Sequence, residues 1–237
     1  MGNPEPNPPL VDPDCAAAGF VLAGGQSSRM GPDKALLRFA GRPLVEHALS
    51  ILREAGLPVS IAGANPSSRS SLAAYAPIIE DAEPGLGPLA GVCAALASTS
   101  ARRAVFPARH AVFLPIDLPL LPPSLLVFLL HHAGITGRAV TVPTVSGFTQ
   151  TFPAVLDRTL LPALQNELEG RRAGCFSAFQ AAADGLDQAI SAVAVEFLAQ
   201  SGQVTHPLGL PPVHWFLNLN SPADLERAEA LLAHAIA

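Results

Sequence analysis

The chain has 237 residues, which suits one α/β domain of generous size, and its 49% of hydrophobic residues can bury a large core. A formal net charge of -5 does not indicate a nucleic-acid-binding protein, whose electrostatic signature is a basic patch or stripe. Only 14% of the residues are charged, so we expect a thinly charged surface with apolar patches for self-association, and a monomer or a weak homo-oligomer.

Neither the cysteines nor the N-terminus indicates secretion. The three cysteines are odd in number and include no C-x-x-C pair, so neither a disulfide framework nor a zinc site is expected. Residues 1–15 are Pro-rich without the apolar core of a signal peptide, and we expect a disordered leader before a single domain over residues 16–237. The apolar stretch 112–130 carries Asp117 and four prolines, which a membrane-spanning helix would not carry. We therefore expect a cytoplasmic protein.

Short apolar runs alternate with longer periodic ones, a pattern that indicates βαβ units around a mainly parallel sheet. In the first half we expect, in chain order, a strand at 19–22, a helix at 43–55, strands at 59–62 and 77–80, a helix at 89–98, a strand at 111–114 and a helix at 124–132. In the second half we expect strands at 138–143, 151–156, 192–197 and 213–219, and helices at 157–168 and 175–183. A last helix should open at Ser221-Pro222-Ala223-Asp224, with Ser as its cap and an acid at its third position.

The loop that follows the first strand is the central feature of the sequence. It reads Leu22-Ala23-Gly24-Gly25-Gln26-Ser27-Ser28-Arg29-Met30-Gly31-Pro32-Asp33-Lys34. Its three glycines allow the backbone to approach a ligand closely, and successive N–H groups in such a loop form an anion site. It is not a Walker loop, because Lys34 is neither preceded by Gly nor followed by Ser or Thr.

Lys34 is the only lysine in the chain, which contains thirteen arginines. The sequence thus uses Arg wherever a general positive charge is sufficient. A single Lys in a Gly-rich loop indicates a need for a compact ammonium group, which can reach a phosphate oxygen without a planar fork. We interpret the loop as a phosphate site with Arg29 and Lys34 as its charges; the alternative is a surface loop with an incidental Lys.

Two carboxylates, Asp81 and Asp117, each follow an expected strand. Ligands of open α/β sheets bind at the carboxyl ends of the strands, so both side chains should face the same ligand. Mg²⁺ is typically held by one or two carboxylates together with substrate phosphates. We expect Asp117 to be a metal ligand and Asp81 to be a nucleotide contact; both could instead be simple turn formers.

A second glycine pattern, Gly85-Leu86-Gly87-Pro88-Leu89-Ala90, fits the dinucleotide-binding fingerprint G-x-G-x-x-[GA]. The acid expected about 20 residues further on is missing, because residues 101–116 contain no Asp or Glu. An oxidoreductase is therefore a weaker alternative.

The loop and the later motifs together resemble the molybdenum cofactor guanylyltransferase family. The matching motifs, in chain order, are Leu22-Ala23-Gly24-Gly25, Ser28-Arg29-Met30-Gly31 with Asp33-Lys34, Glu80-Asp81, Gly87-Pro88-Leu89-Ala90-Gly91, residues 115–119 around Asp117, and Asn218-Leu219-Asn220-Ser221-Pro222 with Asp224-Leu225. The resemblance spans residues 20–232. One departure is Gly63-Ala64-Asn65, where family members often carry N-x-N.

The resemblance implies a three-layer Rossmann-like nucleotidyltransferase fold with a mainly parallel mixed sheet. It implies Mg²⁺-dependent transfer of GMP from GTP to a molybdopterin cofactor, with release of diphosphate. Arg29, Lys34 and Asp117 would be catalytic, with Mg²⁺ on Asp117. Substrate contacts would come from Leu22, Ala23, Gly24, Gly25, Lys34, Asp81, Asp117, Asn218 and Asn220, the two asparagines towards the pterin. Molybdoenzyme apoproteins stay open as further partners.

Two alternatives to this function stay open at the level of the sequence. The first is a nucleotidyltransferase that uses CTP or acts on a sugar phosphate, since those families resemble the first loop too. The Gly24-Gly25 pair favours guanine, because the related cytidylyltransferases resemble L-A-A-G there. The second alternative is a nucleotide-binding protein without turnover.

Overall fold

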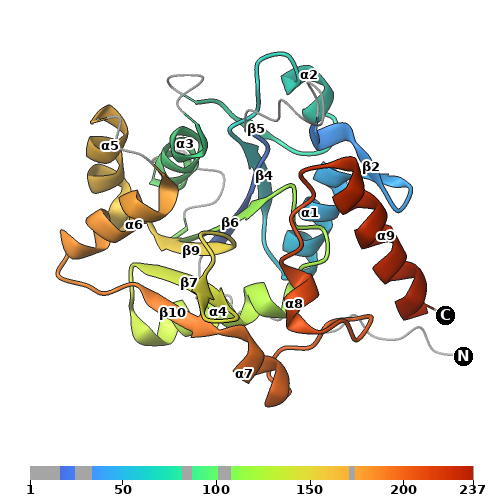
Figure 1. Ribbon diagram of the computed structural model, residues 1–237. Coiled ribbons are helices and arrows are strands. Elements are labelled where there is room, and N and C mark those ends of the chain that lie inside the picture. The colour runs from blue at the N-terminus through green and yellow to red at the C-terminus, as the bar shows by residue number, and fades with distance from the viewer. Residues whose placement is uncertain (1–16, 25–33, 82–86, 101–107, 171–173, 237) are drawn as a thin grey trace, which may run out of the picture.

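The computed structural model describes residues 17–24, 34–81, 87–100, 108–170 and 174–236, and the account that follows concerns these residues (Figure 1). They form an eight-stranded sheet in the order β10-β7-β9-β6-β1-β4-β5, with β8 paired to β7. Its strands are β1 (Ala17–Leu22), β4 (Val59–Ala62), β5 (Ile78–Ile79), β6 (His110–Pro115), β7 (Val140–Val145), β8 (Phe148–Thr149), β9 (Ala154–Asp157) and β10 (Ser191–Ala194). A separate hairpin joins β2 (Arg38–Phe39) and β3 (Arg42–Pro43).

The sheet is mixed but mainly parallel. Strand β1 pairs in parallel with β4 on one side and with β6 on the other, and β4 pairs in parallel with β5. Strand β9 runs antiparallel to both of its neighbours, β6 and β7, while β10 is parallel to β7. The four strands β6, β1, β4 and β5 therefore end at one common edge.

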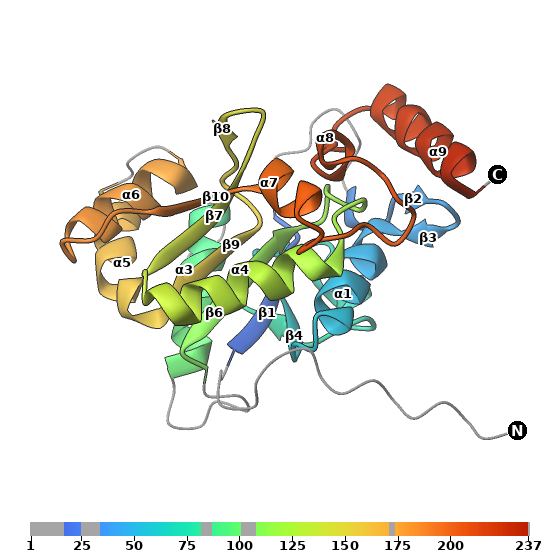
Figure 2. The same ribbon diagram turned by 90° about the horizontal axis from the view of Figure 1, so that it is seen from below.

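Helices cover both faces of the sheet. They are α1 (Leu44–Glu54), α2 (Arg69–Leu72), α3 (Pro88–Ser100), α4 (Pro123–Thr136), α5 (Leu161–Glu169), α6 (Cys175–Asp184), α7 (Val195–Gln200), α8 (Pro212–Trp215) and α9 (Pro222–Ile236), with short 3-10 turns η1 (Lys34–Leu36) and η2 (Arg158–Leu160). Helices α3, α5 and α6 gather on the left in both views, and α9 lies on the right (Figures 1 and 2).

Successive side chains of the buried strands point to opposite faces of the sheet and form two hydrophobic cores. In β1, Phe20 and Leu22 belong to the core under α3, α5 and α6, whereas Val21 belongs to the core with α1 and α4. In β6, Phe113 and Leu114 divide between the two cores in the same way. Side chains that alternate across a strand buried on both faces produce this arrangement. The expected three-layer α/β architecture with a mainly parallel mixed sheet is confirmed.

The predicted elements of the first half are found with shifted ends, whereas two predictions of the second half are wrong. The strand expected at 213–219 is absent, because Pro211 and Pro212 lead into the short helix α8. Trp215 is buried there and donates from Nε1 to the carbonyl oxygen of Leu210 at 2.6 Å. A proline at the start of a helix is favoured, and this context outweighs the strand propensity of the residues that follow.

The second error concerns residues 192–197. Strand β10 ends at Ala194, and α7 begins at the next residue. Val195 and Leu198 of α7 are buried in the core with α1 and α4, while Phe197 between them is 65% exposed. Two buried residues three positions apart are typical of a helix, whereas an apolar run as short as 192–197 does not distinguish a helix from a strand.

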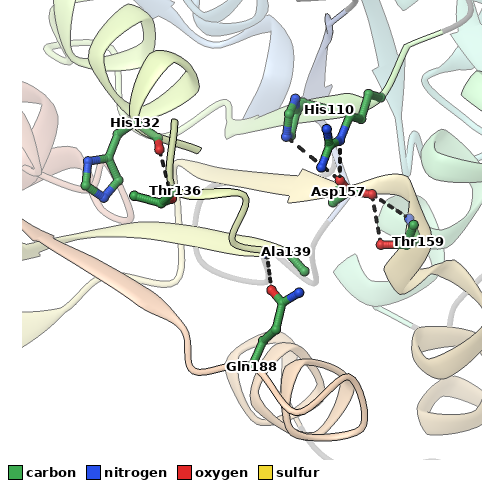
Figure 3. A network of polar contacts seen from close by, with 8 residues as sticks. His110, His132, Thr136, Ala139, Asp157, Thr159 and Gln188 are labelled. Carbon is green, nitrogen blue, oxygen red and sulfur yellow. Dashed lines mark hydrogen bonds and ion pairs between the residues drawn. The ribbon is translucent and has the colours of Figure 1, made fainter. Parts of the chain in front are cut away.

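A polar cluster ties β6 to β9 at the edge of the sheet where β6 begins (Figure 3). Asp157 accepts from Arg109 Nε at 2.9 Å and from the backbone N–H and hydroxyl of Thr159 at 2.9 and 2.8 Å. Buried His110 lies 3.9 Å from the same carboxylate. Asp157 thus caps η2 and links it to the start of β6, at the end of the sheet opposite the carboxyl ends of the parallel strands.

No helix among the described residues is both long and apolar enough to cross a membrane.

Candidate functional site

The carboxyl edge of the four parallel strands carries most of the expected site residues that the structure describes. Leu22 ends β1, and Asp81 and Asp117 follow β5 and β6, on opposite sides of β1. The chain continues from β1 with Ala23, whose N–H donates to the carbonyl oxygen of Ala62 at 3.0 Å. This edge is where open α/β sheets bind ligands.

Gly24 and Gly63 pack backbone against backbone at this edge. A β-carbon built on Gly24 would lie 2.0 Å from the carbonyl oxygen of Gly63, so only glycine fits there without a shift of the backbone. Gly63 itself adopts a φ of +70°. A β-carbon on Gly91 of α3 would lie 3.0 Å from the Cα and N of Gly63. Three glycines thus bring the ends of β1 and β4 and the helix α3 together.

Lys34 is the centre of the site. Its Nζ lies 3.0 Å from Oδ2 of Asp117 and 2.8 Å from Oδ1 of Asn220. The Lys34 side chain is 8% exposed and that of Asp117 is 22% exposed, so the ion pair is partly shielded from water. An ammonium group has three donors, and Lys34 uses two of them in these contacts. The third has no partner among the described residues.

The two acceptors of Lys34 are joined to each other through the backbone. The N–H of Leu219 donates to the carbonyl oxygen of Asp117 at 3.0 Å. The segment before α9 is thereby fixed beside the end of β6. Lys34, Asp117 and Asn220 come from three distant parts of the chain and meet at one point.

Asp81 lies on the β4–β5 side of the same edge and makes a different set of contacts. Burial raises the pKa of the Asp81 carboxyl, while a hydrogen bond from the backbone of Gly63 and the charge of Arg69 offset part of that rise. Its Oδ1 is buried and has no hydrogen-bond partner among the described residues. A buried oxygen without a partner is costly and indicates an acceptor for a ligand donor.

The remaining expected residues divide into two groups. Gly25 and Arg29 lie outside the described residues. Asn218 is exposed beside Asn220, and Leu22 and Ala23 are buried, which leaves their backbone as the part able to meet a ligand. The glycine pattern of the oxidoreductase alternative falls partly outside the described residues as well, since residues 85 and 86 are not described.

The geometry also involves residues to which sequence reasoning gave no role in the site. Gly63 contacts Gly24 and donates to Asp81, although its sequence context indicated only a departure from the family pattern. Asp224 accepts from the N–H of Asn220 at 3.0 Å, although the sequence indicated only a helix start. The signal for Asp224 was present in the Ser221-to-Asp224 spacing, which predicts a capping box.

The donor set fits a divalent cation that arrives with a phosphate ligand. Asp117 offers a carboxylate at the strand edge, and Asp81 offers a second one further along it. Within the described ranges, no group of three or more His, Cys, Asp or Glu side chains could hold a metal. Mg²⁺ suits such a sparse set, because it is bound by one or two carboxylates and completes its shell with phosphates and water.

Comparison with known proteins shows to which family the chain belongs. A family model described as the MobA-like NTP transferase domain matches residues 19–232. A molybdenum cofactor guanylyltransferase from Sinorhizobium fredii is 32% identical over 216 residues, which cover 90% of each chain. One from Xanthomonas euvesicatoria pv. vesicatoria is 41% identical over 108 residues, which cover 46% of this chain and 50% of that protein. The chain thus aligns with about half of the Xanthomonas protein and with nearly all of the Sinorhizobium one.

The fold is shared with a solved structure from Archaeoglobus fulgidus, described as molybdopterin-guanine dinucleotide biosynthesis protein A. The TM-score is 0.71 at 20% sequence identity, and the match covers 92% of this chain and 99% of the other. It confirms the expected Rossmann-like nucleotidyltransferase fold. The chain therefore belongs to the family of MobA-like NTP transferase domains and is a nucleotidyltransferase.

Proposed function

We propose that the protein transfers GMP from GTP to the phosphate of a molybdopterin cofactor and releases diphosphate, with Mg²⁺ as its cofactor. The names of the Sinorhizobium and Xanthomonas relatives support the guanylyl group and the acceptor. The observation that carries the proposal is the position of Lys34, whose ammonium group is held between Asp117 and Asn220 at the strand edge.

Different residues at the carboxyl ends of the strands would bind different parts of the two anionic substrates. Gly24 and the Gly-rich loop that follows it would bring backbone N–H groups to the triphosphate. Lys34 would direct its remaining donor at a phosphate oxygen, and Asp81 would accept from a donor of the nucleoside through its unpartnered oxygen. Asn218 and Asn220 would face the acceptor. The site thus has a nucleotide side at β4–β5 and an acceptor side at the start of α9.

The reaction needs no strong general base. A phosphomonoester has a second pKa near about 6, so the attacking oxygen of the acceptor is already anionic at neutral pH. That oxygen forms a bond to the α-phosphorus of GTP, the bond from this phosphorus to the bridging oxygen breaks, and diphosphate leaves with the electron pair. Two unit charges of like sign at 4 Å repel by about 4 kcal/mol at an effective dielectric constant of 20. The chief task of the protein is therefore to hold two anions together in line.

The positive charge of Lys34 offsets part of this repulsion and stabilises the leaving diphosphate. Asp117 would hold Mg²⁺, and Asp81 lies at the same edge as a second carboxylate. When bound, Mg²⁺ supplies further positive charge to the phosphate oxygens. Asp117 also keeps Lys34 in place before substrate arrives, since the two are joined at 3.0 Å.

A nucleotide panel tests the proposal. We expect GTP with Mg²⁺ to raise the melting temperature of the protein more than CTP, ATP or UTP, and molybdopterin to trigger diphosphate release from GTP. A preference for CTP, or release with a sugar phosphate as acceptor, would replace the substrate assignment. Binding of GTP without diphosphate release in the presence of molybdopterin would instead indicate a binding protein without turnover.

A further inference from the structure

The turn that leads into α9 holds Asn220 by its backbone. Oδ2 of Asp224 accepts from the N–H of Asn220 at 3.0 Å and from the hydroxyl of Ser221 at 2.8 Å. The N–H of Asp224 donates back to the Ser221 hydroxyl at 3.3 Å. This is a variant of the capping box, in which the acid of the first turn reaches one residue further back than usual. The cap of α9 and the position of Asn220 are thus one hydrogen-bonded unit.

Helix α9 is in turn fixed to the body of the protein. Oε1 of Glu229 accepts from the N–H of Ala40 in the β2–β3 hairpin at 3.3 Å. Ala228 on the same helix is fully buried in the core with α1. Asp224 therefore links the backbone of Asn220 to α9, which is itself fixed to the rest of the protein. The side chain of Asn220 in turn accepts from Lys34 Nζ at 2.8 Å.

Lys34 needs such support more than a shorter side chain would. A lysine side chain is flexible and loses much rotamer freedom when it is held in one position. One ion pair with Asp117 fixes the distance of the ammonium group from one oxygen, whereas a second acceptor on another element also fixes its direction. A donor that is preorganised in this way costs no reorganisation at the moment of reaction.

We propose that Asp224 is a positioning residue of the transferase site. It holds the backbone of Asn220 so that the side-chain oxygen Oδ1 of Asn220 accepts from the Lys34 ammonium group together with Asp117. Asp224 acts through Asn220 and does not touch a substrate. The inference rests on the proposed function only where it assigns Lys34 to the triphosphate; the chain of contacts from Asp224 to Lys34 stands independently of the substrate.

The single lysine makes the inference measurable without turnover. Acylation by an amine-reactive ester, followed by peptide mass spectrometry, reports on Lys34 alone once the N-terminal amine is separated as a different peptide. Wild-type Lys34 should react slowly, because it is 8% exposed and held by two acceptors. Asp224→Ala should raise the rate at least about tenfold, the effect of losing a hydrogen bond to a charged group. Asp224→Asn keeps an acceptor oxygen at the same place and should restore the slow rate.

A matched control separates positioning from loss of helix stability. Ala230→Gly lies on an exposed position of the same helix, and Gly in a helix interior is destabilising relative to Ala. Ala230→Gly should leave the Lys34 rate at the wild-type value. An equal rise in Ala230→Gly, or no rise in Asp224→Ala, would overturn the proposal. Asp224 is only half-buried in the first turn of α9, so the variants should fold, and circular dichroism is the check.

Steady-state kinetics distinguish this inference from the proposed function. Asp224→Ala should lower kcat with GTP at least about tenfold and change KM much less, because the Lys34 contact matters most in the transition state. GTP should slow the acylation of wild-type Lys34. If GTP gives no protection while Asp224→Ala still raises the rate, the assignment of Lys34 to the nucleotide fails and the positioning role stands. If GTP protects and Asp224→Ala has no effect, the positioning role alone fails.

Discussion

A β-carbon on residue 24 would lie 2.0 Å from the carbonyl oxygen of Gly63, so the backbones of Gly24 and Gly63 approach each other too closely for any side chain on residue 24. The contact joins the end of β1 to the end of β4. Because the obstructing atom belongs to the backbone, no side-chain rotation relieves the clash.

Gly24→Ala should therefore separate the two strand ends and weaken both stability and nucleotide binding. Overpacking of a tight site costs about 1–3 kcal/mol, which corresponds to a fall in Tm of roughly 2–12 °C for a chain of this size. Differential scanning calorimetry with and without GTP measures both effects. Gly185→Ala is the control, because its β-carbon would meet its nearest neighbours at an ordinary 3.5 Å and its φ is -64°. Equal stability of the Gly24 and Gly185 variants would contradict the close contact.

Lys34→Ala should lower transferase activity at least about 100-fold, the usual loss when one donor to developing negative charge is removed. Lys34→Arg should recover little of it, because a planar guanidinium does not fit between Asp117 and Asn220, which hold a compact ammonium group at 3.0 and 2.8 Å. The measurement is diphosphate release at saturating GTP, with circular dichroism as the check on folding. Activity near the wild-type level in the alanine variant would remove Lys34 from the mechanism.

The sequence predicted which residues lie at the ends of the parallel strands better than it predicted the position of Asn220. The Gly-rich loop and the two aspartates are defined by their place after apolar strands, and parallel strands end at one edge whatever the rest of the fold does. The partner of Asn220 could not be predicted in this way. Lys34 and Asn220 lie 186 residues apart in the sequence, and the segment before α9 reaches the site through the hydrogen bond from the Leu219 N–H to the carbonyl oxygen of Asp117. Residues 213–219 were misassigned for a related reason, since the burial of Trp215 depends on tertiary packing.

Asp117→Asn tests the proposed cation ligand while it keeps a hydrogen-bond acceptor for Lys34. The amide oxygen can still accept from Lys34, whereas the charge that favours Mg²⁺ is lost. We expect turnover to fall at least about tenfold and to require more Mg²⁺. Binding of Mn²⁺ in the presence of GTP, followed by electron paramagnetic resonance, gives a reading that does not depend on turnover. Asp187→Asn is the matched control, because Asp187 is exposed and its φ of +55° suits Asn equally well. Unchanged Mn²⁺ binding in the Asp117 variant would assign the cation elsewhere.

Gly63→Asn should be tolerated, although the residue has a φ of +70°. Asn enters the left-handed region more readily than other residues with a β-carbon, and the nearest atom to a β-carbon at this position would be 3.6 Å away. The new side chain would lie at the nucleotide side of the edge and should lower KM for GTP. Gly63→Val is the contrasting variant, because a β-branched residue is strained at this φ and should lower Tm. Equal melting temperatures for the two variants would contradict this account of the backbone.

Asp81→Asn should stabilise the protein at neutral pH while it weakens nucleotide binding. Burial raises the pKa of this carboxyl in the folded state, so the ionised form is penalised relative to the unfolded chain. The penalty is absent below the unfolded pKa, grows as the pH rises towards the folded pKa, and is complete above it. The gain in Tm from Asp81→Asn should accordingly be largest at neutral pH and disappear in acid. Melting curves of the wild type, Asp81→Asn and the exposed control Asp187→Asn across this range test it. A gain that persists unchanged in acid would show that its source is not the charge of Asp81.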